Sequence, residues 1–391
     1  MINKISTAIV AAYFLSSLCS SITAVAIAVH FAEDGQSAFT ITGTLIAAAV
    51  AQIFVAPVLA PVFDKHTPNA LITIAAAIDI ATLLVLTIWP KPIILIAGTF
   101  LSASTTCIII PALFTLAENL SRSRAAETFA NLDTARLLGS FIGPTLGGAL
   151  VHVGTVRYAF IAEILASALT ILIINVLPLV PVQKRESEVK EESFFARLIA
   201  APVLLLRNRK TRAGLSSIWG AIIFTSIYNV ALVFFAVDTL KVGGIGYALL
   251  MQAFIIGRLI GARFSVRITE SAAYQVLLLS GIIMGAMIAG AGLVPNLFVA
   301  IIAFLCAGIC NALQIAALRL LIYNAVEESI RPKALSTMGT VNTSAMFIGY
   351  CVGAPAVAYF GPALSLVISG VGTLVITLIS AVFSRLTTTS R

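Results

Sequence analysis

Three ionisable side chains lie inside long apolar segments of this chain, where a charge is costly. Asp79 stands midway along the apolar segment 70–90, Glu163 lies in the segment 158–180, and Arg258 lies near the middle of the segment 245–267. A charge in a hydrocarbon environment costs several kcal/mol unless it is paired or hydrated. The two carboxyl groups are therefore candidate proton carriers. A structural hydrogen bond to a neighbouring helix would explain them equally well.

The guanidinium group of Arg258 suggests contact with a substrate. Arginine stays charged, and its planar fork suits carboxylates or catechol-like oxygens. A substrate that carries an anionic or electron-rich group would give this residue a reason to lie near mid-membrane. A structural ion pair with Asp79 or another acid inside the membrane is the rival interpretation.

Uncharged polar residues in four of the apolar segments form a second set of candidates for substrate binding. Serine and threonine often bond to their own helix or hold helices together, so a structural role is the stronger interpretation for any one of them. Amide side chains cost more to leave in lipid and are the better candidates. The set consists of Ser20, Thr105, Ser226, Tyr228, Asn229, Asn311 and Gln314.

The composition indicates which elements must position these residues. Hydrophobic residues make up 60% of the 391 residues and charged residues only 10%, and the mean hydropathy is +1.06. This usage excludes an ordinary soluble domain and is typical of polytopic membrane proteins. Hydropathy predicts about twelve transmembrane helices, at 6–30, 41–63, 70–90, 93–118, 130–151, 158–180, 214–237, 245–267, 272–293, 296–325, 334–359 and 362–384.

The net charge of +8 is distributed unevenly between the loops. If the N-terminus is cytoplasmic, the loops on that side carry most of the lysine and arginine residues, and the other side carries only Lys91, Arg157 and Lys241. This positive-inside bias predicts that both termini lie in the cytoplasm, for a protein of a bacterial inner membrane. It also explains the basic charge without a nucleic-acid partner.

Motifs for soluble catalysis are missing from the sequence. It contains no phosphate-binding P-loop and no His-Glu metal motif, and its three histidines stand at the ends of apolar segments. The five cysteines fall within apolar segments, where we interpret them as packing residues. We therefore predict no enzyme activity, no cofactor and no metal site.

Glycine and proline recur at a fixed spacing in the apolar segment 130–151. Gly139, Gly143 and Gly147 stand four residues apart, so on a helix they form a smooth stripe against which another helix backbone can pack closely. Pro144 removes a backbone donor beside this stripe, which kinks or loosens the helix. With Gly148, the pattern reads G-x-x-x-G-P-x-x-G-G.

This pattern resembles the antiporter motif in the fifth helix of the major facilitator superfamily, in the branch that exports drugs and metabolites against protons. The resemblance implies an all-α polytopic membrane protein with twelve transmembrane helices in two pseudo-symmetric six-helix bundles. It also implies that the motif helix lies at the interface between the two halves and takes part in a conformational gate. We expect the protein to be a monomer.

A second motif of the same superfamily is only partly present. The loop after the second helix usually reads G-x-x-x-D-R/K-x-G-R/K, whereas this chain has Ala60-x-x-x-Asp64-Lys65-His66-Thr67-Pro68. The aspartate and one base are kept, but both glycines and the second base are missing. The resemblance implies that Asp64 and Lys65 form the gate together with Asp133 and Arg136. The alternative is a set of interfacial charges that only follow the topology.

An internal repeat predicts how the chain is divided. A shift of 206 residues places Gly143 on Gly349 and Gly147 on Gly353, and it also places Ser20 on Ser226, Gln52 on Arg258 and Thr105 on Asn311. Parallel repeats of this kind predict two six-helix halves with a substrate site where they meet, and Gln52 joins Arg258 as a candidate contact. The predicted parts are a bundle at 1–182, a linker with an amphipathic helix at 183–213 and a bundle at 214–391.

These observations leave two classes of function open. The first is a secondary active transporter that exports a small, possibly anionic organic molecule by proton antiport with alternating access, or a proton-coupled importer. The second is a non-transporting membrane sensor or scaffold with the same architecture, which the incomplete loop motif favours. The intact glycine motif and the polar set inside the spans favour transport.

Overall fold

The computed structural model describes residues 2–63, 65–120, 125–153, 155–177, 209–325 and 331–386. In these ranges the chain forms α-helices and two short π-helical segments, and it contains no strand. The chain divides into two compact units, Met1–Gln36 with Gly43–Glu188 and Ser37–Thr42 with Val189–Arg391. They are called the N-terminal and C-terminal units below. Most of the predicted linker at 183–213 lies outside the described residues.

Two helices of the N-terminal unit begin at a threonine that caps them. The Thr67 hydroxyl accepts a hydrogen bond from the Ala70 amide at 3.3 Å, and Pro68 fills the first helical position, where no amide donor is needed. Thr155 caps the last helix in the same way. The elements are α1 (Ile2–Glu33), α2 (Ala38–Val50), η1 (Ala51–Val55), α3 (Ala56–Phe63), α4 (Pro68–Ile88), α5 (Pro92–Leu120), α6 (Ala125–Val153) and α7 (Val156–Val176).

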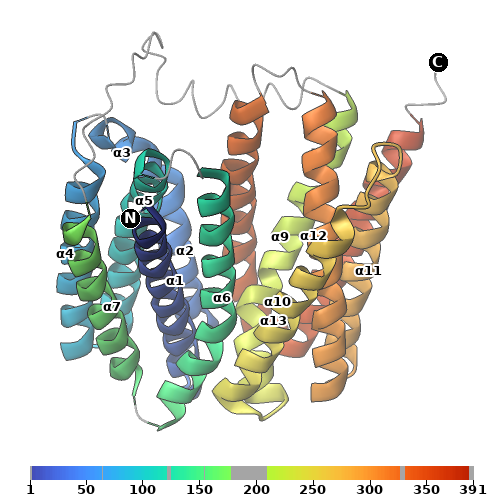
Figure 1. Ribbon diagram of the computed structural model, residues 1–391. Coiled ribbons are helices and arrows are strands. Elements are labelled where there is room, and N and C mark those ends of the chain that lie inside the picture. Colours follow the sequence, from blue (N-terminus) through green and yellow to red (C-terminus); the bar gives the residue numbers. More distant parts are fainter. Residues whose placement is uncertain are drawn as a thin grey trace. The chain divides into compact units, whose positions relative to one another are not determined.

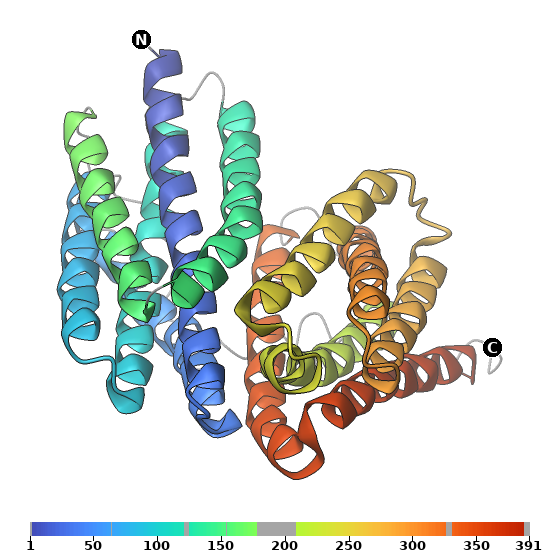
Figure 2. The same cartoon turned by 90° about the horizontal axis from the view of Figure 1, so that it is seen from below.

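The C-terminal unit ends in a helical hairpin. Its elements are α9 (Arg209–Phe234), η3 (Phe235–Thr239), α10 (Gly243–Ser265), α11 (Ala273–Leu293), α12 (Leu297–Ala325) and α13 (Arg331–Leu386). Inside α13 the backbone leaves the helical conformation at Gly361, and the chain reverses direction there (Figures 1 and 2). The two limbs of α13 correspond to the last two predicted spans.

Ten helical stretches among the described residues are long and apolar enough to cross a membrane. One of them, Asn342–Val382, contains the break at Gly361 and accounts for two of the predicted spans. Helix α6 has 29 residues, which at about 1.5 Å per residue is also enough to cross a bilayer. Its glycine, proline and charged residues lower its hydropathy. The ten stretches thus agree with the predicted polytopic, all-helical fold.

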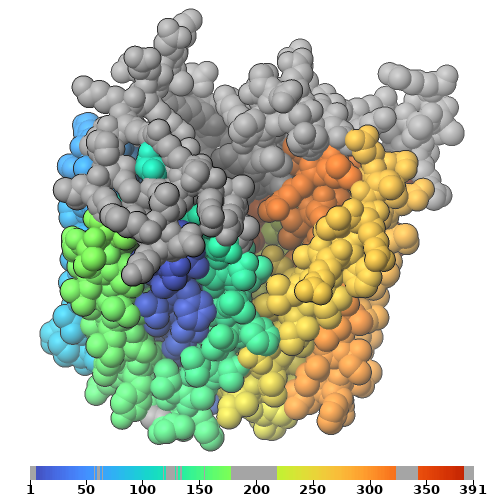
Figure 3. Space-filling view, in the orientation of Figure 1, coloured from blue at the N-terminus to red at the C-terminus, as the bar shows by residue number. Residues whose placement is uncertain are grey.

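The two units are built alike. Helix α1 lies between α6 and α7, and Figure 3 shows it as a narrow band between them. In the C-terminal unit α9 lies between the two limbs of α13, because Gly353 of the first limb meets Val230 of α9 and Gly372 of the second limb meets Phe224. The shift of 206 residues carries α1, α6 and α7 onto α9 and these limbs. The same packing therefore occurs twice.

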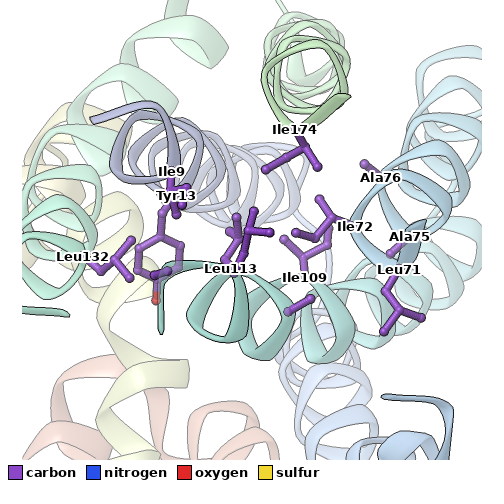
Figure 4. Close-up of a cluster of buried hydrophobic side chains, with 13 residues drawn as sticks. Ile9, Tyr13, Leu71, Ile72, Ala75, Ala76, Ile109, Leu113, Leu132 and Ile174 are labelled. Carbon is purple, nitrogen blue, oxygen red and sulfur yellow. The ribbon is translucent and has the colours of Figure 1, made fainter. Parts of the chain in front are cut away.

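Five helices enclose a hydrophobic cluster in the N-terminal unit (Figure 4). The Tyr13 ring meets the Phe114 ring edge to face, with 5.9 Å between the centroids. In the C-terminal unit Leu277, Leu318 and Ile322 occupy a matching cluster at positions that the repeat predicts. The labelled residues of the N-terminal cluster are Ile9, Tyr13, Leu71, Ile72, Ala75, Ala76, Ile109, Leu113, Leu132 and Ile174.

The bend at Gly361 gives a testable expectation for stability. Its φ of 75° with a ψ of 168° lies in a region that only glycine adopts readily, so Gly361→Ala should lower the stability by about 1–3 kcal/mol. Gly290 is the control, because it is helical and a Cβ there would meet nothing within 4 Å. Gly290→Ala should leave the thermal unfolding temperature of the purified protein unchanged or raise it slightly. Equal unfolding temperatures for Gly361→Ala and the wild type would contradict the expectation.

Candidate functional site

Glu163 lies in the first half of α7 and points toward α1. Only 7% of the residue is exposed. The Ser20 hydroxyl donates a hydrogen bond to its Oε1 at 3.2 Å, and the Thr23 hydroxyl donates to its Oε2. Ser20 and Thr23 are three residues apart on α1, so they lie on one face of the helix and reach the same carboxyl group.

Asp79 lies in the middle of α4 and is bonded by two other helices. The residue is 6% exposed. The Thr105 hydroxyl of α5 donates to Oδ1 at 3.4 Å, and the Ser167 hydroxyl of α7 donates to Oδ2 at 3.2 Å. Each oxygen of this buried carboxyl group therefore has a hydroxyl donor.

The two carboxyl groups belong to one polar network. Ser167, which bonds Asp79, stands one helical turn after Glu163 on α7, and the two carboxyl groups lie within electrostatic reach of each other. The network, called the carboxyl pair below, joins α1, α4, α5 and α7 inside the N-terminal unit. Burial favours a neutral carboxyl group, whereas hydroxyl donors favour a charged one, so this surrounding can hold a carboxyl group in either protonation state.

Two residues predicted to contact a substrate bond to the carboxyl pair. The hydroxyl groups of Ser20 and Thr105 are bonded to Glu163 and Asp79, and their contact with a substrate stays a prediction. The two acids thus make the hydrogen bonds to neighbouring helices that the structural interpretation expects. The bonds from Thr23 and Ser167 to these acids were not predicted from the sequence. Their spacing from Ser20 and Glu163, three and four residues, is the signal that would have found them.

The glycine stripe of α6 packs against the backbone of α1. A Cβ atom at Gly139 would lie 2.7 Å from the Leu18 nitrogen, one at Gly143 would lie 2.9 Å from the Leu18 oxygen, and one at Gly147 would lie 2.5 Å from the Ile22 oxygen. The backbone of α1 cannot move aside as a flexible side chain would. Pro144 and Gly148 are buried beside these glycines. The stripe therefore makes a close contact inside the N-terminal unit, and its part in a gate between the halves stays a prediction.

In the C-terminal unit the predicted contacts fall into two groups. Ser226 is 1% exposed and donates to its own helix at the Ile222 oxygen, and Gln314 is 4% exposed with its Nε2 atom beside Gly281 and Thr377. These two lie in the packed interior. Tyr228 is within electrostatic reach of Arg258 and Tyr350, and the Asn229 side chain is beside Tyr350. Asn311 is half-buried on α12.

Residues 9–348 match the family described as the Major Facilitator Superfamily. The chain belongs to the major facilitator superfamily. A comparison with curated proteins found no match. The predicted superfamily is therefore confirmed, whereas its drug and metabolite efflux branch stays a prediction.

Solved structures of superfamily transporters share the fold. The nucleoside transporter NupG is 14% identical, with a TM-score of 0.78 over 97% of this chain and 98% of that one. A POT family transporter in complex with a thioalcohol-conjugated peptide is 15% identical, with a TM-score of 0.75 over 97% and 96%. The human organic anion transporter MFSD10 is 15% identical, with a TM-score of 0.65 over 97% and 99%. At these identities the likeness shows the fold alone, and with the family it indicates a transporter.

The loop motif of the superfamily is only partly visible in the structure. Asp64 and the side chain of Asp133 lie outside the described part of the chain. Lys65 is exposed in the turn after α3, and the backbone oxygen of Arg136 accepts a hydrogen bond from the Ser17 hydroxyl at 3.1 Å. The predicted gate of Asp64, Lys65, Asp133 and Arg136 thus stays a prediction.

Gln52, the repeat partner of Arg258, is exposed in the π-helical segment η1, which follows α2. Its contact with a substrate stays a prediction. Among the described residues, no three histidine, cysteine, aspartate or glutamate side chains come together as they would to hold a metal ion.

Proposed function

We propose that this superfamily member is a secondary active transporter that exports a small organic molecule in exchange for protons, with the carboxyl pair as the coupling site. One observation carries the proposal. Asp79 and Glu163 are buried inside membrane-spanning helices, and all four of their oxygens accept hydrogen bonds from hydroxyl groups on neighbouring helices. A neutral packing role would not require two ionisable groups at this depth.

Protonation of either carboxyl group changes the hydrogen bonds that its hydroxyl partners can make. A carboxylate accepts hydrogen bonds at both oxygens, whereas a protonated carboxyl group donates one, so one hydroxyl partner must then turn and accept. For Glu163 these partners are Ser20 and Thr23 on α1, and for Asp79 they are Thr105 on α5 and Ser167 on α7. Proton binding thereby alters contacts between α1 and α7 and between α4 and its neighbours. Proton binding can therefore stabilise one conformation more than the other, which is required to couple proton movement to transport.

The direction of transport rests on the glycine motif. The pattern G-x-x-x-G-P-x-x-G-G is intact from Gly139 to Gly148 and resembles that of antiporters. The distribution of lysine and arginine supports cytoplasmic termini and a bacterial inner membrane. We propose a monomer with six-helix bundles at 1–182 and 214–391, joined by the linker at 183–213, which transports by alternating access.

A non-transporting sensor or scaffold is the second candidate. One observation favours it, namely the loss of both glycines and the second base from the motif that begins at Ala60. A protein that keeps the fold without the transport cycle would not need this loop to latch and release.

Purified protein in vesicles with a trapped pH-sensitive dye tests the proposal. A nucleoside, a dipeptide, an aromatic carboxylate and an aliphatic carboxylate serve as the first probes. With an acidic interior, a substrate of an antiporter accumulates inside while the interior becomes more alkaline. Accumulation that requires an acidic exterior would show a proton-coupled importer instead. A sensor or scaffold would give neither accumulation nor counterflow with any probe.

A further inference from the structure

A group of aromatic side chains in the C-terminal unit surrounds Tyr228 of α9. Its ring centroid lies 6.0 Å from that of Phe254 on α10 and 5.7 Å from that of Phe304 on α12. Tyr247 of α10 and Tyr350 of α13 lie within electrostatic reach of its hydroxyl group. These five residues are called the tyrosine cluster. Four helices thus bring three phenol groups and two phenyl rings together.

One strongly basic group stands at this cluster. Tyr247, Phe254 and Arg258 follow each other at spacings of seven and four residues, so they share one face of α10. Arg258 is within electrostatic reach of Tyr228, and the Asn229 side chain is beside Tyr350. Arg258, Asn229 and Phe254 are half-buried, whereas the three tyrosines are buried. A basic residue, an amide residue and a phenylalanine that are partly exposed therefore stand next to the buried tyrosines.

The bundle architecture does not require the tyrosine cluster. The shift of 206 residues leads from the five residues of the cluster to small or apolar residues in the first half of the chain, which has the same helix packing. These are Ile22, Ile41, Ala48, Gly98 and Pro144. A cluster of polar aromatic residues that occurs in only one of two pseudo-symmetric halves is expected of a ligand-binding site, because the shared helix packing does not require it.

The charges around the cluster favour an anion. The acidic residues in the described part of the C-terminal unit are Asp238 and Glu270, which are exposed beyond opposite ends of α10. The cluster itself contains no acidic side chain. A cationic ligand would be repelled by Arg258, and no residue of the cluster would offset that repulsion. Phenol and amide groups can donate to an anion, and a guanidinium fork binds a carboxylate with two hydrogen bonds.

From this arrangement we infer that the tyrosine cluster and Arg258 form a substrate-binding site in the C-terminal unit, and that they select a planar aromatic carboxylate. The carboxylate meets Arg258 and the phenol hydroxyls, and the ring lies against the aromatic faces. An aliphatic carboxylate would lose the ring contacts, and a neutral aromatic alcohol would lose the charge. The inference rests on the proposed transport function, because it names the substrate class for it.

Equilibrium dialysis of radiolabelled benzoate against the purified full-length protein tests the inference without a gradient. Benzoate should bind, and unlabelled benzoate should displace it better than cyclohexanecarboxylate, which keeps the charge, or benzyl alcohol, which keeps the ring. Arg258→Gln should weaken benzoate binding about tenfold or more, because a charged hydrogen-bond donor is lost. Arg258→Lys keeps the charge but loses the planar fork, so it should bind benzoate more weakly than the wild type and more tightly than Arg258→Gln. Tyr350→Phe and Tyr247→Phe should each weaken binding by a smaller factor.

Two residues of the same unit serve as controls. Tyr274 of α11 donates to the Ser380 oxygen, and Arg263 is exposed near the end of α10. Tyr274→Phe and Arg263→Gln should bind benzoate as the wild type does. The unfolding temperature of each variant shows whether it is folded. If Arg258→Gln does not fold, benzoate binding by Arg258→Lys tests the role of the guanidinium group.

The outcomes separate this inference from the proposed function. Absence of benzoate binding, equal displacement by cyclohexanecarboxylate, or unchanged binding in both folded Arg258 variants would overturn the inference, even if another compound is exchanged for protons. If benzoate binds as expected but no pH gradient drives its accumulation, the assignment of the tyrosine cluster holds and the proposed proton antiport is wrong.

Discussion

Glu163→Gln is expected to reduce proton-driven accumulation of substrate to the level of protein-free vesicles while leaving the N-terminal unit folded. Glutamine has nearly the same shape, and its amide oxygen still accepts a hydrogen bond from Ser20 or Thr23. It carries no exchangeable acidic proton, so the step that links proton movement to the conformational cycle is lost. Counterflow, which needs no net proton movement, should persist in the same vesicles. The measurement is the ratio of gradient-driven uptake to counterflow.

Asp79→Asn should have the same kind of effect, because both acids belong to one network through Ser167 on α7. The double variant should then be no worse than the more affected single variant, as expected for residues that act together. Glu33 is an acidic residue at the end of α1 that is exposed, and Glu33→Gln should transport normally. Full uphill transport with unchanged pH dependence in both Glu163→Gln and Asp79→Asn would show that the carboxyl pair is not the coupling site.

The second large effect is expected at Gly143. A Cβ at Gly143 would meet the Ser21 Cβ and the backbone of Leu18 and Ile22 on α1, none of which can turn aside, so even alanine would push the two helices apart, and leucine would do so further. Overpacking of this kind costs about 1–3 kcal/mol or more. Gly143→Ala should lower the thermal unfolding temperature, and Gly143→Leu should give little folded protein in detergent extracts. Size-exclusion profiles and unfolding temperatures measure both.

Because the glycine stripe contacts α1 of its own unit, a bulky residue in the stripe is expected to impair folding. The sequence alone suggests a contact that moves between the halves, for which a bulky residue would stop transport without unfolding the protein. In the structure, the stripe meets α1 of the same unit, so a folding defect should come first. Gly290→Leu, in a helix position with open space, is the matched control and should fold normally. Folded Gly143→Leu protein that has lost transport would instead favour the moving contact.

Hydropathy and local signals predict most of the fold. The apolar segments coincide with the helices because a membrane requires every backbone polar group to be bonded within its own segment. The last two predicted spans, 334–359 and 362–384, are separated at the glycine that breaks α13. The repeat at 206 residues pairs α1 with α9, and both helices pack against glycines at matching positions. Gly143 and Gly147 contact α1, and Gly349 and Gly353 contact α9. The π-helical turns at η1 and η3 have no comparable signal in the sequence.

The candidate site was predicted only in part. Asp79 and Glu163 stand out in the sequence because an acid within an apolar segment is rare. Their partners do not stand out, because serine and threonine occur in many membrane helices and bond to their own backbone when nothing else is near. Tyr247 and Tyr350 escaped notice for a related reason, as single aromatic residues are common in such helices.

The residues alone predict a helical membrane protein, the positions of its spans, its family pattern and the ionisable groups inside the apolar segments. These properties follow from each residue and its near neighbours, since the cost of transfer into a membrane depends on local composition. The bonds of Ser20 and Thr23 to Glu163, the bonds of Thr105 and Ser167 to Asp79, and the contact of the glycine stripe with α1 are seen only in the folded chain. Those contacts join residues between 26 and 143 positions apart in the chain. They depend on which helix faces which, and that is set by the packing of all the helices together.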